Sequence, residues 1–298
     1  MADKRLKYPV ARTHQFIHHA PQFRPVQRGA RRKGLLRRYE SQDGKKYLEI
    51  ALFAELDVAD QDLLLCLLAM LFPEHKGNVI SEVPNHPVNM ILRDNLNLEG
   101  SVLPMNTLGA QTTAYELLTE LGRRTGKSDY DWLEASLGRL ARVNFKYRDN
   151  TSVSSFNLMS WSAQIDTETN RMTNIRFVVN PVSAQAVLST PDDKDSQGYF
   201  LCHRGERAQL KSEESRALHN VLCGLVMPGK KRSLNVDMLA DKVYARYDEE
   251  LTDDMVKYRR KAIIGALNAI DALEYWSCET FGRGKEAGAE VKRKKVSG

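Results

Sequence analysis

The sequence predicts an α+β fold of two tandem winged-helix domains, because the same order of elements occurs twice along the chain. In each half, helical segments with regularly spaced apolar residues are followed by short strands around polar turns. In the second half a basic helix directly precedes a hairpin, as in winged helices that bind DNA. We expect the two domains at residues 39–188 and 200–295. Residues 189–199 would be a linker, and residues 1–38 a basic, disordered arm.

The distribution of charge fits a protein that docks on DNA in one orientation. Residues 1–38 hold eleven Lys and Arg against Asp3 alone, a net charge of +10. Residues 283–298 carry a net charge of +4. Because the whole chain carries only +6, residues 39–282 must carry −8. Basic ends on an acidic body indicate local rather than uniform contact with a polyanion.

The first half begins with a predicted strand and an apolar helix, whose start is marked by Asp57 and Asp60. A long irregular connection follows, and Ser128-Asp-Tyr-Asp131 predicts a capping box for the third helix. The predicted elements are strand 47–53, helix 57–72, connection 73–106, helices 113–122 and 128–143, and strands 145–148, 154–159 and 175–179. Helix, turn, helix and then a small sheet is the winged-helix order.

The second half repeats this order. Ser212 and Asn235 stand where helix N-caps are expected. The predicted elements are a helix from Ser212 to Pro228, a short strand at Leu234, a helix from Asn235 to Tyr244, a turn at 245–251, a helix over 252–273, and strands 275–281 and 289–292 around a turn at 282–284.

The helix over 252–273 carries the strongest signal for function. Val256, Ile263, Leu267 and Ile270 form its predicted buried stripe, and basic residues gather at its N-terminal end. Cations normally favour the C-terminal end of a helix, so a bound polyanion would offset this placement. A solvated basic face is the alternative, but the cluster directly before a hairpin favours DNA contact.

The candidate DNA-binding residues of the second domain lie on this helix and on the wing. Arg or Lys can contact guanine and Asn can contact adenine, whereas residues at a wing tip more often contact phosphate. The candidates are Lys257, Tyr258, Arg259, Arg260, Lys261 and Asn268 on the helix, and Arg283, Lys285, Lys292 and Arg293 on the wing.

The first domain gives a weaker signal, because its third helix begins with Asp129, Asp131 and Glu134, which repel phosphates. Its candidate DNA-binding residues are Arg123, Arg124 and Lys127 before that helix, Arg139 and Arg142 on its later turns, and Lys146 and Arg148 in the hairpin. The domain either binds DNA through its turn and hairpin or chiefly mediates self-association, and the sequence leaves both open.

No pattern in the sequence predicts catalysis, so we expect a protein that is not an enzyme and has no cofactor. Gly126-Lys-Ser128 resembles the end of a P-loop, but Leu121 stands where the motif requires glycine. Cys202 and Cys223 lack the usual spacing of zinc ligands, and we expect reduced, structural cysteines. The chain has no apolar run long enough to cross a membrane and no secretory signal, which predicts a cytoplasmic protein.

Over residues 110–295 the chain resembles the replication initiators of IncQ-type plasmids, the replication protein C family. The segments that carry the resemblance are Tyr115–Gly122, Leu137–Phe145, Val179–Val187, Glu214–Lys230 and the helix and strand over 255–281. The basic start at Met255–Lys261 matches the family's recognition helix. Tyr258 and Ile263-Ile264 interrupt a pattern that is more continuously basic in the family.

The resemblance implies binding to double-stranded DNA at repeated origin sequences (iterons) through tandem winged helices, melting of an adjacent AT-rich region and recruitment of a replicative helicase. It also implies control of plasmid copy number through self-association or repression. A transcriptional repressor with the same fold is the alternative function, and a nicking enzyme is an alternative of a different class.

Overall fold

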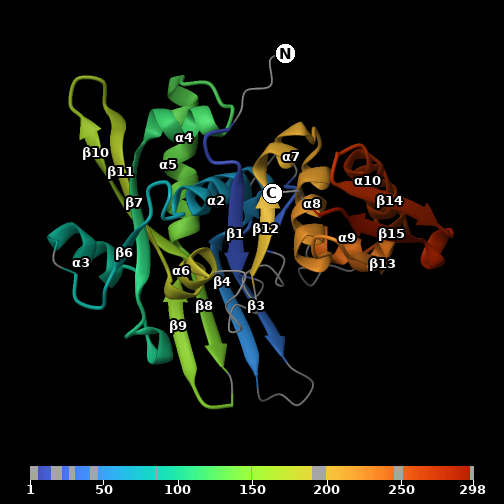
Figure 1. The fold of residues 1–298 in the computed structure, drawn as a ribbon, viewed down its shortest axis with the longest axis horizontal. Helices are drawn as coiled ribbons and strands as arrows, with labels where there is room; N and C mark the ends of the chain where they lie inside the picture. Colours follow the sequence, from blue (N-terminus) through green and yellow to red (C-terminus); the bar gives the residue numbers. More distant parts are fainter. Residues whose placement is uncertain are drawn as a thin grey trace.

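The computed structural model describes most of the chain as helices and small sheets. The described residues are 6–14, 22–26, 31–40, 46–84, 86–148, 150–189, 199–244 and 251–295. Within them, two winged-helix domains lie next to each other, and the N-terminal strand runs between them (Figure 1). The predicted α+β class with small antiparallel sheets is confirmed.

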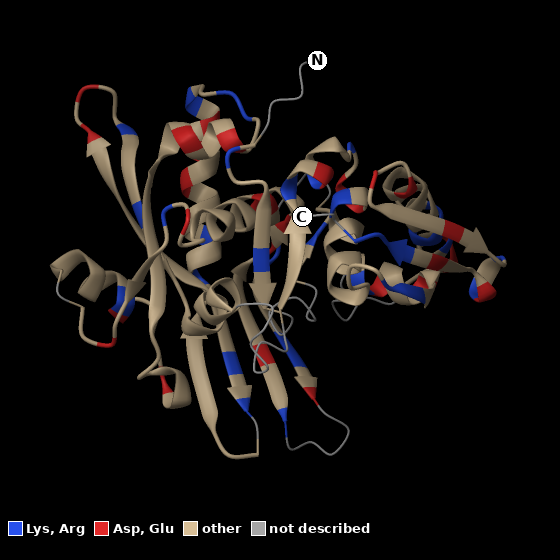
Figure 2. Cartoon of the chain, viewed as in Figure 1, with Lys and Arg blue, Asp and Glu red and all other residues tan. Residues whose placement is uncertain are grey.

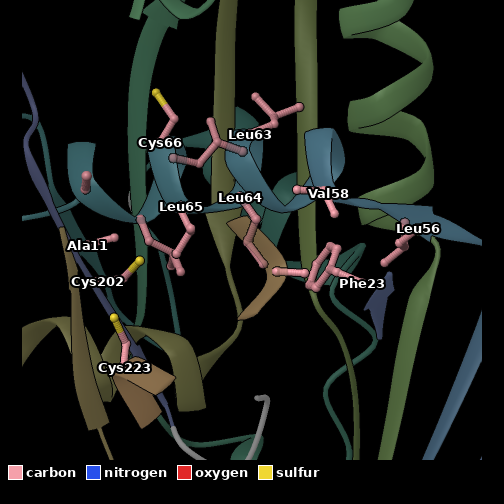
Figure 3. Close-up of a cluster of buried hydrophobic side chains, with 14 of the residues drawn as sticks. Ala11, Phe23, Leu56, Val58, Leu63, Leu64, Leu65, Cys66, Cys202 and Cys223 are labelled. Atoms are coloured by element: carbon pink, nitrogen blue, oxygen red, sulfur yellow. The ribbon is translucent and has the colours of Figure 1, made fainter. Parts of the chain in front are cut away.

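The centre of the first domain is α2 (Val58–Met70), which is buried on almost every side. Its N-cap is Asp57, and Asp57 and Asp60 form a reciprocal capping box with each other's backbone N–H groups. Because the helix is apolar all round, it is stable only when neighbours cover every face. Strands and helices of both domains supply this cover, and the apolar side chains pack into one continuous core (Figure 3).

Two four-stranded antiparallel sheets flank α2. Their orders are β3-β4-β8-β9 and β10-β11-β7-β6. The strands are β3 (Lys33–Glu40), β4 (Tyr47–Ala54), β6 (Asn78–Ile80), β7 (Thr107–Thr113), β8 (Val143–Arg148), β9 (Val153–Asn157), β10 (Met159–Asp166) and β11 (Arg171–Val179). The helices of the domain are α3 (Pro87–Asp94), α4 (Ala114–Glu120), α5 (Lys127–Ala141) and α6 (Pro181–Leu188), with a 3-10 turn η1 (Gly100–Val102).

The second domain follows the predicted order closely. Its elements are β12 (Tyr199–His203), α7 (Arg204–Gln209), α8 (Glu213–Leu225), β13 (Lys231–Asn235), α9 (Val236–Tyr244), α10 (Asp253–Asp271), β14 (Trp276–Phe281), η2 (Gly284–Glu286) and β15 (Gly288–Arg293). The three strands β13-β15-β14 form the antiparallel wing sheet. The predicted caps Ser212 and Asn235 each accept hydrogen bonds from the first turn of their helix, and Thr252 does the same for α10.

The expectation of a disordered arm over residues 1–38 is wrong for the described part of that range. β1 (Val10–His14) pairs with β12, β2 (Phe23–Arg24) pairs with β5 (Leu56–Asp57), and β3 extends the first sheet. The physical reason is burial, since Tyr8, Ala11 and Phe23 enter the core despite the surrounding charge. Residues 1–5, 15–21 and 27–30 lie outside the described residues.

Two further expectations for the first domain need correction. The connection 73–106 contains β6 and α3 and is therefore not irregular throughout. The capping box at Ser128 is also wrong, because α5 begins at Lys127 with Gly126 as N-cap and no side-chain cap. The predicted linker lies almost wholly outside the described residues, at 190–198, and so does most of the predicted turn at 245–251. The domain boundaries stay predictions.

Buried arginines hold the two domains together. Arg207 of α7 forms an ion pair with Asp62 of α2 and donates to Gln61 Oε1 at 2.7 Å. Arg204 donates to the backbone oxygen of Tyr8 and to Glu120 O at 3.1 Å. Arg216 of α8 also binds Asp62, at 2.5 Å. Charged hydrogen bonds inside a packed junction fix the geometry of both domains more firmly than surface pairs do.

Candidate nucleic-acid interface

The helix α10 presents one exposed, partly basic face. Ile263, Leu267 and Ile270 are fully buried, as predicted, whereas Val256 is only partly buried. The side chains on the opposite face are exposed, and Tyr258 is 60% exposed. The exposed candidates on α10 are Lys257, Tyr258, Lys261 and Asn268. Their spacing of three, four and seven residues places them along one side of the helix.

The first turn of α10 balances the helix dipole before the basic residues begin. Asp253 and Asp254 lie in that turn, and Thr252 Oγ1 accepts the hydrogen bond of Met255 N at 3.3 Å. Lys257 Nζ lies 3.3 Å from Asp254 Oδ1, but both side chains are largely exposed, so this pair is weak. The basic residues of α10 therefore begin in its second turn, at Lys257, and not in its first turn.

Two predicted contact residues on α10 have structural partners instead. Arg259 is only 8% exposed, and its guanidinium lies 5.0 Å from the centre of the Tyr244 ring on α9. Arg260 forms a two-pronged ion pair with Asp237, at 2.5 and 2.6 Å. Both arginines thus tie α10 to α9, and Arg259 is too buried to reach a groove.

The wing tip is exposed and basic. Arg283 and Lys285 lie in the turn between β14 and β15, where Gly282 and Gly284 adopt positive φ angles of 71° and 59°. At Gly282 a Cβ atom would lie 2.4 Å from Glu286 O, so this tight turn requires glycine. The turn holds both cations at the outer end of the hairpin, which is the predicted position. Their contact with phosphate stays a prediction.

The other two wing candidates lie at the opposite end of the hairpin. Lys292 is exposed and stands across from Ser277 and Lys231. Arg293 is almost completely buried, with its guanidinium 5.1 Å from the centre of the Trp276 ring and Nη2 2.9 Å from Leu201 O. Arg293 therefore stabilises the domain rather than offering a surface charge.

The structure adds three basic residues that the sequence reasoning did not select. Lys230, Lys231 and Arg232 are exposed at the start of β13. Lys231 stands directly opposite Lys292 in the sheet, and its Nζ pairs with Glu290 Oε1 at 3.2 Å, so Glu290 partly balances this pair of lysines. The run of Gly-Lys-Lys-Arg at 229–232 was a visible signal in the sequence.

The candidates of the first domain do not form one continuous basic surface. Arg124 is exposed before α5 and Lys127 is exposed at its first residue, whereas Lys146 and Arg148 are exposed on β8 beyond its other end. An α-helix of 15 residues is about 22 Å long, so the two groups are well separated. Exposed Asp131 and Glu134 lie between them on α5. Figure 2 shows acidic and basic residues interspersed over the first domain.

The remaining arginines of the first domain divide between packing and surface. Arg139 is 14% exposed and binds Asp60 through Nε at 3.1 Å and Nη2 at 2.7 Å, so the structure gives it a role in packing, and its assignment to DNA stays a prediction. Arg123 stacks on Trp132, with 3.5 Å between the guanidinium and the ring centre. Arg142 is exposed and lies 4.6 Å from the centre of the Phe53 ring.

The chain is similar to known proteins in both sequence pattern and fold. A family model described as "Replication protein C (RepC)" matches residues 10–293. No curated protein matches the chain in sequence. No helix in the described part of the chain has the length and apolar character needed to span a membrane.

Two solved structures of RctB domains have a similar fold. A crystal structure of RctB domains 2-3 matches with a TM-score of 0.54 and 12% identity, covering 94% of this chain and 96% of that one. A second structure of RctB domains 2 and 3 matches with a TM-score of 0.53 and 10% identity, covering 91% and 94%. The Pi initiator protein in complex with iteron DNA matches more weakly, with a TM-score of 0.45 and 12% identity over 61% of this chain and 79% of that one. At these identities the RctB matches support the fold.

Proposed function

The chain belongs to the replication protein C family, and from this membership we propose that it initiates plasmid replication by binding repeated DNA sequences at the origin. The observation that carries the proposal is the exposed face of α10 with Lys257, Tyr258, Lys261 and Asn268. On a winged helix this face is the one that enters the major groove. The exposed wing tip with Arg283 and Lys285 supplies phosphate contacts beside it.

The roles on α10 divide by chemistry. The side-chain amide of Asn268 can form two hydrogen bonds with one adenine, and Lys257 and Lys261 can each bind guanine or a phosphate. Tyr258 adds an apolar ring with a hydroxyl group at its edge. We assign sequence reading to this face and orientation on the duplex to the wing tip, with Lys230, Lys231 and Lys292 as further phosphate contacts.

Binding assays with repeats from the plasmid's own origin test the assignment. Lys257→Ala and Lys261→Ala should each weaken binding severalfold, because each removes one charge from the contact face. Arg176→Ala is the matched control, since it removes one positive charge from the sheet of the first domain. Equal affinities for the three variants would remove the assignment of α10 as the recognition helix.

An opening assay separates an initiator from a repressor. The protein should make the AT-rich region of a supercoiled origin plasmid reactive to permanganate, whereas a repressor would bind the repeats without opening them. Strand cleavage in the presence of a divalent metal would instead support a nicking enzyme. Recruitment of a replicative helicase and self-association belong to the same proposal, and co-purification on origin DNA tests the first.

A further inference from the structure

A cluster of two cysteines and one histidine lies inside the second domain, away from the DNA-binding face. Cys202 comes from β12, and His219 and Cys223 come from α8. All three side chains are fully buried, and their sulfur and nitrogen atoms lie within 4.8 Å of one another. Figure 3 shows Cys202 and Cys223 next to each other, with Cys66 on a separate helix.

The distances in this cluster are close to those of a tetrahedral metal site. Zinc binds sulfur at about 2.3 Å and imidazole nitrogen at about 2.0 Å, which places sulfur about 3.6 Å from nitrogen around the metal. His219 Nδ1 lies 4.0 Å from Cys202 Sγ and 3.9 Å from Cys223 Sγ. A shift of a few tenths of an ångström would bring these two sulfur–nitrogen distances to that value, and all the candidate ligand atoms lie within 4.8 Å of one another. Cys223 Sγ also lies 3.9 Å from Nε2 of the same ring. As hydrogen bonds, by contrast, thiol contacts of this length are weak.

The backbone explains why these residues meet. His219 and Cys223 are four residues apart on α8 and therefore lie on the same face of the helix. Cys202 approaches that face from the strand β12, which the sequence spacing alone does not predict. This is why the usual spacing of zinc ligands is missing from the chain.

A carboxylate holds the histidine in the orientation that a metal ligand needs. Glu206 Oε2 lies 3.0 Å from His219 Nε2 and also accepts the hydrogen bond of Trp276 Nε1 at 3.2 Å. A proton kept on Nε2 by Glu206 leaves the lone pair of Nδ1 free for a metal. Metal-binding histidines almost always have such a partner. The other oxygen of this carboxylate, Oε1, is also buried, and it has no hydrogen-bond partner among the described residues.

We propose that Cys202, His219 and Cys223 bind one zinc ion, with Glu206 positioning the histidine. Soft thiolate ligands together with imidazole favour zinc over calcium or magnesium. On binding, the two thiols would each release a proton and become thiolates. The two negative charges of the thiolates balance the two positive charges of the zinc ion, so the net charge of the pocket stays the same. This balance matters because Arg293 lies close by, with Nη1 3.4 Å from Cys223 O.

The ion would link the domain junction to the second domain. Cys202 stands opposite Ala11 in the β1-β12 pair, while His219 and Cys223 belong to the first helix of the winged helix. Zinc would therefore fix the N-terminal strand and β12 against α8. The inference does not depend on the proposed DNA binding.

Metal analysis of the full chain, purified without chelators or affinity metals, tests the proposal. Wild-type protein should contain one zinc ion per chain, and Cys202→Ser or Cys223→Ser should reduce this to a small fraction. Cys278→Ser is the matched control, because Cys278 is also buried but lies on β14 outside the cluster. The control should keep its zinc. Cobalt added to zinc-free protein should give the intense visible bands of tetrahedral coordination and a thiolate charge-transfer band.

Several outcomes would overturn the proposal. Folded wild-type protein that contains no zinc and gives no thiolate-cobalt bands excludes the site. A mass lower by two hydrogens, lost on reduction, would show that the cysteines form a disulfide instead. If the serine variants do not fold, titrating wild-type thiols with a mercurial should release one zinc ion per chain to a chromogenic chelator, and no release would refute the proposal.

Discussion

Replacing Arg139 with alanine should destabilise the first domain without changing how strongly the folded protein binds DNA. Arg139 reaches from α5 to Asp60 at the start of α2, which is completely buried. Asp60 also accepts hydrogen bonds from Arg31 at 3.0 Å and from Ser136 Oγ at 2.5 Å. The arginine is thus one of several groups that neutralise a carboxylate in the core.

The expected loss is about 3 kcal/mol of unfolding free energy. Removing one partner of a buried ion pair costs about 3–5 kcal/mol, because the other charge is left in the interior. The lower end of that range applies here, since Arg31 still pairs with Asp60. Arg142→Ala, three residues along the chain, removes only an exposed stacking contact with Phe53, worth about 0.5–1 kcal/mol.

Urea unfolding of both variants, followed by far-ultraviolet circular dichroism, measures the difference. The free energy of unfolding of Arg139→Ala should be lower than that of Arg142→Ala by about 2 kcal/mol, the difference between these two contact energies. Under conditions where Arg139→Ala is folded, its DNA affinity should have the same salt dependence as wild type. Equal stabilities of the two variants, with a smaller salt dependence for Arg139→Ala, would show that Arg139 contacts DNA after all.

Three further outcomes follow from buried or partly buried groups. Burial acts to raise the pKa of Glu116, but hydrogen bonds from Lys76 and Tyr8 lower this pKa from 4.5 to about 2. A lowered folded-state pKa gives stability that is present above pH 4.5 and is lost as the pH falls towards 2. Glu116→Gln should therefore reduce the acid dependence of the unfolding free energy between these pH values, and an unchanged dependence would contradict this. Deleting residues 1–38 should lower the melting temperature in calorimetry, because β1, β2 and β3 are lost; an unchanged value would contradict the assigned packing. Arg259→Ala should also lower the melting temperature but leave the salt dependence of DNA binding unchanged, and a weaker salt dependence would return this arginine to the interface.

Local signals in the sequence predicted the elements well. Ser212 and Asn235 each cap the helix that they were expected to cap, and the helices expected to begin near Asp57 and Thr252 do begin there. Capping depends on the backbone within three residues, so the sequence carries most of the cause, although the capping box expected at Ser128 did not form. The alternation of helix and hairpin in the second domain follows for the same reason.

Long-range pairing was much less predictable. Arg139 and Asp60 are 79 residues apart, and β1 pairs with β12 across the whole first domain. A basic composition predicted a disordered arm, but a few buried side chains, such as Tyr8 and Ala11, were enough to order parts of it. Tertiary burial in these cases outweighs what composition alone favours.

The burial of Arg259 on α10 could have been predicted from periodicity. Arg259 stands four residues before Ile263 and seven before Ala266, so the helical spacing places it on the buried side. The charge of Arg259 favours DNA contact, but its position on the helix favours burial. Arg260 differs, because its partner Asp237 lies on another helix and only the fold brings the two together.

The salt dependence of binding to the origin repeats tests the central claim most directly. If the exposed face of α10 and the wing tip contact phosphates, alanine at Lys257, Lys261, Arg283 and Lys285 together should remove up to four contacts. Each phosphate contact contributes about 0.9 to the slope of log affinity against log salt, so the slope should fall in magnitude by about 3–4. The variant should keep the wild-type melting temperature, because all four side chains are exposed. A slope equal to that of wild type, in a folded variant, would contradict the claim that this surface binds DNA.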